Sequence, residues 1–127
     1  MNGGADAEIT IAALDNDLAV LDALQMLLTL NGYRVRTYSS ARSFLDDVHR
    51  CTPHCLILEP NLEESGGAAV ARELAASYLF VPIVALTAYP DSARTRELAD
   101  VGVHTMLAKP VASEVLLSQI ASALLSQ

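Results

Sequence analysis

The sequence predicts an α/β fold: a five-stranded parallel sheet, doubly wound as five βα units, with helices on both faces. Short apolar runs that suit buried strands alternate with stretches of helical periodicity along the whole chain. Helical crossovers between such strands force them to run parallel. The length of 127 residues fits one domain over residues 1–127, with an ordered core expected from about 8 to 126.

The first two strand–helix units are indicated in the N-terminal third of the chain. Residues 9–14 are apolar and partly β-branched, and a helix with leucines on one face follows and ends at Gly32. Residues 33–38 alternate in polarity, as a strand with one buried face does. A second helix is expected after Ser40, because serine hydroxyls cap helix N-termini.

Three more units are predicted in the remainder of the chain. The fourth strand is a continuous apolar run, which is typical of a strand buried on both faces. The fourth helix has the weakest amphipathic pattern. The strands are expected at residues 55–59, 81–87 and 104–108, and the helices around Val70 and Leu74, from Pro90 to about residue 101, and at 113–125.

Composition excludes several classes of function. The net charge is −7 and the eight basic residues are scattered, which argues against direct nucleic-acid binding. No apolar run reaches the length of a membrane span, and residues 1–8 lack the basic start of a secretory signal, so we expect a cytoplasmic protein. Cys51 and Cys55 are expected to be a loop thiol and a buried strand thiol, with a disulfide or a metal pair as the weaker alternatives.

Charged and polar residues stand at the carboxyl ends of the predicted strands. In open α/β sheets, sites form at these ends, where the strand order reverses. Clustered carboxylates suit Mg²⁺, and a hydroxyl and an ammonium beside it can bind a phosphoryl group. Singly, each residue has an ordinary explanation as a helix cap, a strand-end threonine or a solvated lysine. The set is Asp15, Asn16 and Asp17 after the first strand, Glu59 after the third, Thr87 after the fourth and Lys109 after the fifth.

With these residues the chain resembles the response-regulator receiver family of two-component signalling, over about residues 9–126. Asp15 matches the first acid of the family's acidic pair, and Thr87 matches its strand-four hydroxyl. Lys109 matches its lysine, and Pro110 matches the proline that follows a cis peptide bond. The resemblance implies the flavodoxin-like receiver fold and looks closest to receivers that precede helix-turn-helix output domains.

The resemblance also shows where this chain departs from the family. Glu59 stands at the position of the phosphorylated aspartate, and Gly67 matches the glycine that begins the third helix. Asn16 replaces the second acid, Glu63 replaces the loop proline, and Met106 replaces the switch aromatic. Methionine is flexible and has no ring hydroxyl, so the usual rotating switch is missing; filling a gap in the core is the alternative role.

The resemblance implies a role for each position. Any Mg²⁺ binding is expected to be weak or absent, because Asn16 removes one acid; the ligands would be Asp15, Glu59 and Asn61. Asp17 could compensate for the lost acid, but in an ungapped alignment it begins a helix and points elsewhere. The roles are phosphoacceptor equivalent for Glu59, acidic pocket for Asp15, Asn16 and Asp17, and switch or phosphate contact for Thr87, Met106 and Lys109.

Three hypotheses follow for function. The leading one is a phosphorylation-independent receiver, in which Glu59 pairs with Lys109 and the domain regulates through protein contacts. The alternatives are a residual phosphoacceptor and an adaptor with a vestigial pocket. An enzyme is not expected, because no nucleophile–histidine pair occurs in these loops, and His49, His54 and His104 lie away from the predicted pocket.

The expected partner is a protein: a histidine kinase, an output domain or another regulator. The family also suggests a homodimer through the face formed by the fourth helix, fifth strand and fifth helix. Neither membrane nor nucleic acid is expected as a partner.

Overall fold

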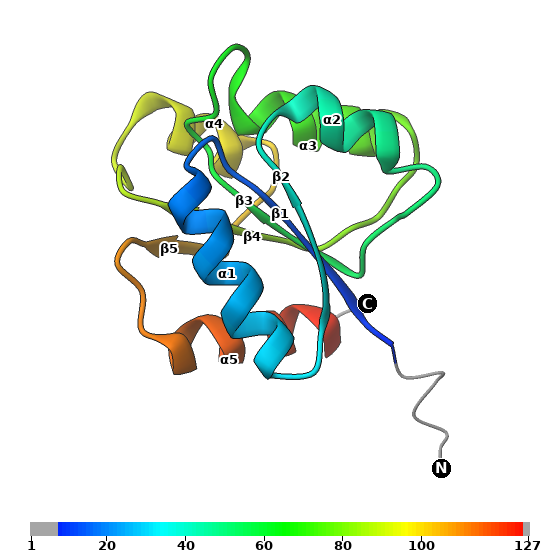
Figure 1. Ribbon diagram of the computed structural model, residues 1–127. Helices are drawn as coiled ribbons and strands as arrows, with labels where there is room; N and C mark the ends of the chain where they lie inside the picture. Colours follow the sequence, from blue (N-terminus) through cyan, green and yellow to red (C-terminus); the bar gives the residue numbers. More distant parts are fainter. Residues whose placement is uncertain (1–7, 126–127) are drawn as a thin grey trace.

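The computed structural model describes residues 8–125, in which five strands and five helices alternate along the chain (Figure 1). Residues 1–7 and the predicted core end at residue 126 lie outside the described residues. The strands are β1 (Thr10–Leu14), β2 (Arg34–Tyr38), β3 (Cys55–Leu58), β4 (Ile83–Thr87) and β5 (Met106–Ala108). The helices are α1 (Leu18–Leu30), α2 (Ala41–Asp47), α3 (Gly66–Ala76), α4 (Ala93–Asp100) and α5 (Ser113–Leu125).

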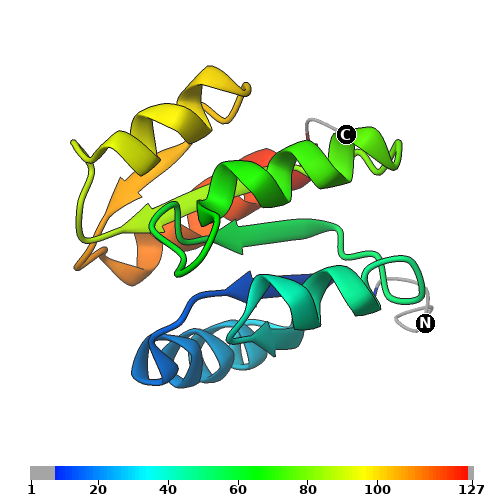
Figure 2. The same cartoon turned by 90° about the horizontal axis from the view of Figure 1, so that it is seen from above.

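The sheet has the strand order β2-β1-β3-β4-β5, and every neighbouring pair is parallel. The strand arrows accordingly point the same way when the molecule is viewed from above (Figure 2). The chain passes from β1 outward to β2, returns past β1 to β3, and then continues in the opposite direction to β5. The predicted fold class, a doubly wound five-stranded parallel sheet, is confirmed.

The core is divided between the two faces of the sheet. Successive side chains of a strand point to opposite faces, so Ile11 and Ala13 pack with residues of α1 and α5, whereas Ala12 and Leu14 pack with residues of α2, α3 and α4. The two groups of helices lie on opposite sides of the sheet in Figure 1. Every residue of β3 is buried, as expected for a central strand covered on both faces.

Two predicted boundaries are shifted by local backbone chemistry. β4 begins at Ile83 rather than at residue 81; Pro82 has no N–H for the ladder, and its carbonyl accepts from Leu56 N at 2.9 Å. α4 begins at Ala93 rather than near residue 90, because Ser92 caps its N-terminus.

The two cysteines lie where the sequence predicts. Both are free thiols; Cys51 is partly exposed and Cys55 is buried in β3. Burial raises the pKa of the Cys55 thiol to about 12, so this side chain stays protonated and is a core residue. Within residues 8–125, no helix combines the length and the apolar character needed to cross a membrane.

Candidate functional site

The site forms at the carboxyl edge of the sheet, beside the point where the strand order reverses between β1 and β3. The backbone of Glu59 donates to Leu14 O at 3.1 Å, which fixes the end of β3 against the end of β1. The backbone of Lys109 donates to Thr87 O at 2.8 Å, which fixes the end of β5 against the end of β4. Residues from four strands are thereby brought to one place.

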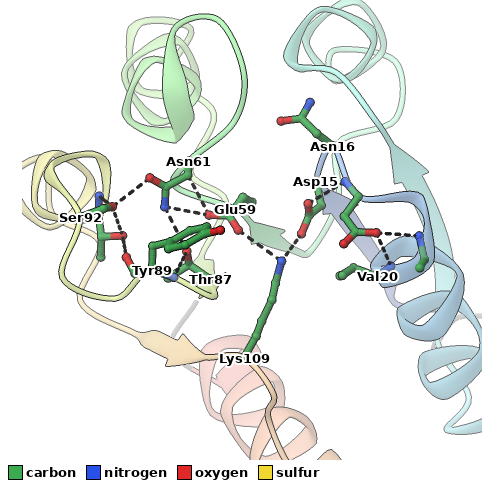
Figure 3. A network of polar contacts seen from close by, with 12 residues as sticks. Asp15, Asn16, Val20, Glu59, Asn61, Thr87, Tyr89, Ser92 and Lys109 are labelled. Carbon is green, nitrogen blue, oxygen red and sulfur yellow. Dashed lines mark hydrogen bonds and ion pairs between the residues drawn. The ribbon is translucent and has the colours of Figure 1, made fainter.

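Lys109 lies between two buried carboxylates (Figure 3). Its Nζ is 2.8 Å from Asp15 Oδ2 and 3.3 Å from Glu59 Oε1. Asp15 and Glu59 are 6% and 7% exposed, so their mutual repulsion would be costly without a cation between them. The ion pair of Glu59 with Lys109, predicted from the sequence, is present.

Two opposing effects set the pKa of Lys109. Burial alone would lower this pKa, because it penalises the charged ammonium. The hydrogen bond and charge of Asp15, together with the charge and hydrogen bond of Glu59, outweigh burial and raise the pKa above its ordinary value. The ammonium therefore stays charged at neutral pH.

Asn61 holds the second oxygen of Glu59. The backbone N–H of Asn61 donates to Glu59 Oε2 at 2.8 Å, and its side-chain NH₂ donates to the same oxygen at 3.2 Å. The NH₂ group also donates to Thr87 Oγ1 at 3.1 Å, and this hydroxyl accepts from Tyr89 N at 3.0 Å. Both carboxylate oxygens of Glu59 are thus engaged, and the fully buried Thr87 is connected to Glu59 through Asn61.

Asn16 and Asp17 do not join this cluster. The side chain of Asn16 points away from Lys109 in Figure 3; it donates to Ser39 O at 2.9 Å and accepts from Glu63 N at 2.7 Å. The carboxylate of Asp17 caps α1 by accepting from backbone N–H groups of the first turn. Among Asp15, Asn16 and Asp17, the contact with Lys109 is made by Asp15 in the described structure.

Gly67 has a steric reason to be glycine. A Cβ atom there would lie 3.0 Å from Glu59 O and 3.0 Å from Pro60 Cα, both of them backbone atoms that cannot easily yield. Met106, at the start of β5, pairs with Ala85 of β4 and packs against the core on the α4 side. These contacts agree with the core-filling alternative for Met106. The Lys109-Pro110 bond is cis, as the resemblance implies.

The side chains that could hold Mg²⁺ already have partners in this structure. Receiver domains typically bind Mg²⁺ at the acidic pocket, but no group of three His, Cys, Asp or Glu in residues 8–125 could hold a metal ion. Asp15 and Glu59 already share the ammonium of Lys109. The side chain of Asn61 directs its NH₂ at Glu59, and its oxygen accepts from Ser92, so a cation would have to share this oxygen with the Ser92 hydroxyl.

One member of the network was missed by sequence reasoning. The Ser92 hydroxyl donates to Asn61 Oδ1 at 2.9 Å and so links α4 to the site. The signal that could have located it is the spacing of Ser92 and Thr95, which suits an N-cap and its third helical residue. Pro90 and Asp91 gave an earlier and equally plausible start for the helix.

Comparisons with known proteins agree with this geometry. A family model described as Response regulator receiver domain matches residues 11–121. Response regulator protein TmoT of Ectopseudomonas mendocina is 36% identical over 119 residues, which cover 94% of this chain and 54% of that protein. Transcriptional regulatory protein TdiR of Thauera aromatica is 30% identical over 115 residues, covering 91% and 51% respectively.

A solved structure of a response regulator has the same fold. The response regulator StyR superimposes with a TM-score of 0.80 at 31% identity, over 92% of this chain and 59% of that one. The chain therefore spans about half the length of the curated relatives it matches.

Proposed function

This chain belongs to the response regulator receiver family of two-component signalling, and we propose that it signals without being phosphorylated at position 59. In this proposal Glu59 stands at the phosphoacceptor position and its carboxylate is a permanent occupant of the pocket. Receiver domains are generally non-enzymatic signalling domains, and the proposal assigns this chain no catalytic residue.

One observation carries the proposal: both carboxylate oxygens of Glu59 are engaged inside the pocket. In the family, the lysine and the threonine hold the acyl phosphate. Here Lys109 contacts Glu59 directly at 3.3 Å, and Thr87 is reached through Asn61. The groups that would receive a phosphoryl group therefore already have a partner.

The length of glutamate opposes phosphoryl transfer as well. Its carboxylate lies about 1.5 Å further from the backbone than that of an aspartate. A misplacement of this order can cost about a hundredfold in rate. An attacking oxygen would also have to leave either Lys109 or Asn61. A carboxylate has one negative charge and a phosphoryl group has more, so the state held by Glu59 need not equal the phosphorylated state of a relative.

The proposed output is protein contact. The partner class is a histidine kinase, an output domain or another regulator, and the matched residues cover 54% and 51% of the two curated relatives. A second copy could use the face formed by α4, β5 and α5. Direct nucleic-acid binding is not proposed, because the net charge is −7 and opposes contact with phosphates.

The test measures phosphoryl transfer directly. The full chain and a Glu59→Asp variant are incubated with acetyl phosphate and Mg²⁺, and their intact masses are recorded. Transfer would break the P–O bond to acetate, form a bond from phosphorus to the carboxylate oxygen, and release acetate. We expect mass gain of one phosphoryl group in Glu59→Asp and none in the natural chain.

The other outcomes separate the alternatives. If the natural chain gains a phosphoryl group, the proposal is wrong and the domain is a phosphorylated switch. If neither protein gains it, the pocket is vestigial and the domain is an adaptor. Unchanged conformation and partner binding in Glu59→Gln would also contradict the proposal, because the charge at position 59 would then have no role.

A further inference from the structure

Asn61 connects the candidate site to α4, and we propose that its side chain is a latch through which residue 59 sets the position of that helix. The inference rests on the proposed function, in which Glu59 permanently occupies the pocket. The amide of Asn61 uses its nitrogen for Glu59 and Thr87 and its oxygen for Ser92, at 3.2, 3.1 and 2.9 Å respectively. Figure 3 shows Asn61 between Glu59 and Ser92.

Glu59 determines which way the amide of Asn61 faces. An ionised carboxylate only accepts hydrogen bonds, so it requires the NH₂ group on its own side. The amide oxygen is then directed toward Ser92, where it accepts from the hydroxyl. A residue at position 59 without an acceptor would remove one of the two acceptors that hold the NH₂ group in this direction, leaving Thr87 Oγ1 alone.

Ser92 transmits the contact to the helix. Its hydroxyl oxygen caps α4 by accepting from Thr95 N at 3.1 Å. The hydroxyl of Thr95, which is 3% exposed, donates to Tyr89 O at 2.8 Å. The loop between β4 and α4 and the first turn of α4 are therefore joined, and they meet the site at Asn61.

The packing of α4 makes these polar contacts important. Thr95 and Leu98 are the buried residues of α4, and of these Leu98 alone is apolar, so the helix has few apolar side chains to fix its position. Elements with few buried apolar contacts open at low free energy. Loss of a polar contact at the N-terminus of α4 should therefore be measurable as local opening.

The test is a double-mutant cycle read by amide hydrogen exchange in α4 of the full chain. Glu59→Ala and Asn61→Ala are each expected to speed exchange at residues 93–100 by about three- to tenfold, which corresponds to the hydrogen bond between Ser92 and Asn61 that reaches α4. The double variant should match Asn61→Ala alone, because Glu59 acts through Asn61. Glu59→Leu keeps most of the volume without an acceptor and should repeat the Glu59→Ala result, which guards against a variant that fails to fold.

Two controls separate the latch from simple helix capping. Ser92→Asp keeps an oxygen that can cap α4 but cannot donate to Asn61 Oδ1, so it should also speed exchange in α4. Ser40→Ala removes a cap of the same type from α2, where the hydroxyl accepts from Ser43 N at 3.1 Å. It should loosen α2 and leave α4 unchanged.

Additive effects of Glu59→Ala and Asn61→Ala would overturn the latch, because the two residues would then act on α4 independently. Unchanged exchange of α4 in Asn61→Ala would overturn it as well. The cycle uses no phosphodonor. Mass gain of the natural chain in acetyl phosphate would therefore contradict the proposed function and would not change the result of the cycle. Failure of the proposed function can thus be distinguished from failure of the latch.

Discussion

Lys109 is the only lysine in the chain, so its titration can be followed without assignment of other ammonium groups. The raised pKa of Lys109 predicts an NMR midpoint above the ordinary lysine value, measured on the ε-carbon. A base whose pKa is higher in the folded state stabilises the fold fully below the unfolded pKa, and this contribution is lost as pH rises through the folded pKa. We therefore expect Lys109 to contribute to a decline in the free energy of unfolding above about pH 10, beside the buried Cys55 thiol, whose raised pKa acts in the same direction from about pH 9.

Variants of the two acids test the cause of this shift. Asp15→Asn should lower the midpoint more than Glu59→Gln, because Asp15 makes the shorter contact with Nζ, 2.8 Å against 3.3 Å. A midpoint at or below the ordinary lysine value in the natural chain would mean that burial dominates over the two carboxylates.

Individual site residues were predictable by type and position, but not by contact. Asp15, Glu59, Thr87 and Lys109 stand at strand ends, and the topology of a doubly wound sheet brings such ends together. The partners of the Asn16 side-chain amide come from segments distant in sequence. Asn16 donates a hydrogen bond to Ser39 O and accepts one from the backbone N–H of residue 63. No local sequence pattern predicts either contact.

The attachment of α4 to the loop between β3 and α3 gives a prediction about stability. The guanidinium of Arg94 donates to Ser65 O and to Glu64 O, both at 2.9 Å, and it covers Gly66. Arg94→Met should lower the free energy of unfolding in urea by about 1 kcal/mol, since each hydrogen bond contributes modestly and the side chain is partly exposed. Limited proteolysis in this loop should also become faster.

Arg42→Met is the matched control. Arg42 reaches Asp46 at 3.9 Å on the exposed surface of α2, and such pairs contribute little. Equal losses in the two variants would show that the carbonyl contacts of Arg94 add nothing beyond an ordinary surface charge.

The elements were predictable where their signals are local. Asp17 and Ser40 cap helices through their own side chains, and α1 and α2 begin where these residues indicate. The start of α3 follows a different rule: Ser65 makes no side-chain cap, and the carbonyls before the helix are bonded by Arg94 from another element. Glu64 there has a φ of 71°, in the left-handed region, which residue type alone would not suggest.

For the molecule as a whole, strand order and charge together determine what the pocket can bind. Reversal of the order beside β1 and β3 collects the acids, and the cis bond at Pro110 follows the lysine that lies between them. Parallel pairing could be predicted because helical crossovers leave few alternatives for five βα units, whereas the flavodoxin-like arrangement was implied by the family resemblance. The balance of two buried carboxylates against one ammonium appears only in the folded chain.

This balance predicts a weak response to Mg²⁺. With a dissociation constant above about 10 mM, 10 mM Mg²⁺ would add less than about 0.4 kcal/mol of stability and raise the Tm by less than about 2 °C. The measurement is thermal unfolding in MgCl₂ against NaCl of equal ionic strength, because a chain of net charge −7 also gains from screening alone. Asn16→Asp combined with Glu59→Asp adds an acid and shortens another, so it should respond more strongly. If the natural chain responds as strongly as this double variant, Mg²⁺ displaces Lys109 from Asp15 and Glu59, and the pocket retains a metal site that its resting contacts do not reveal.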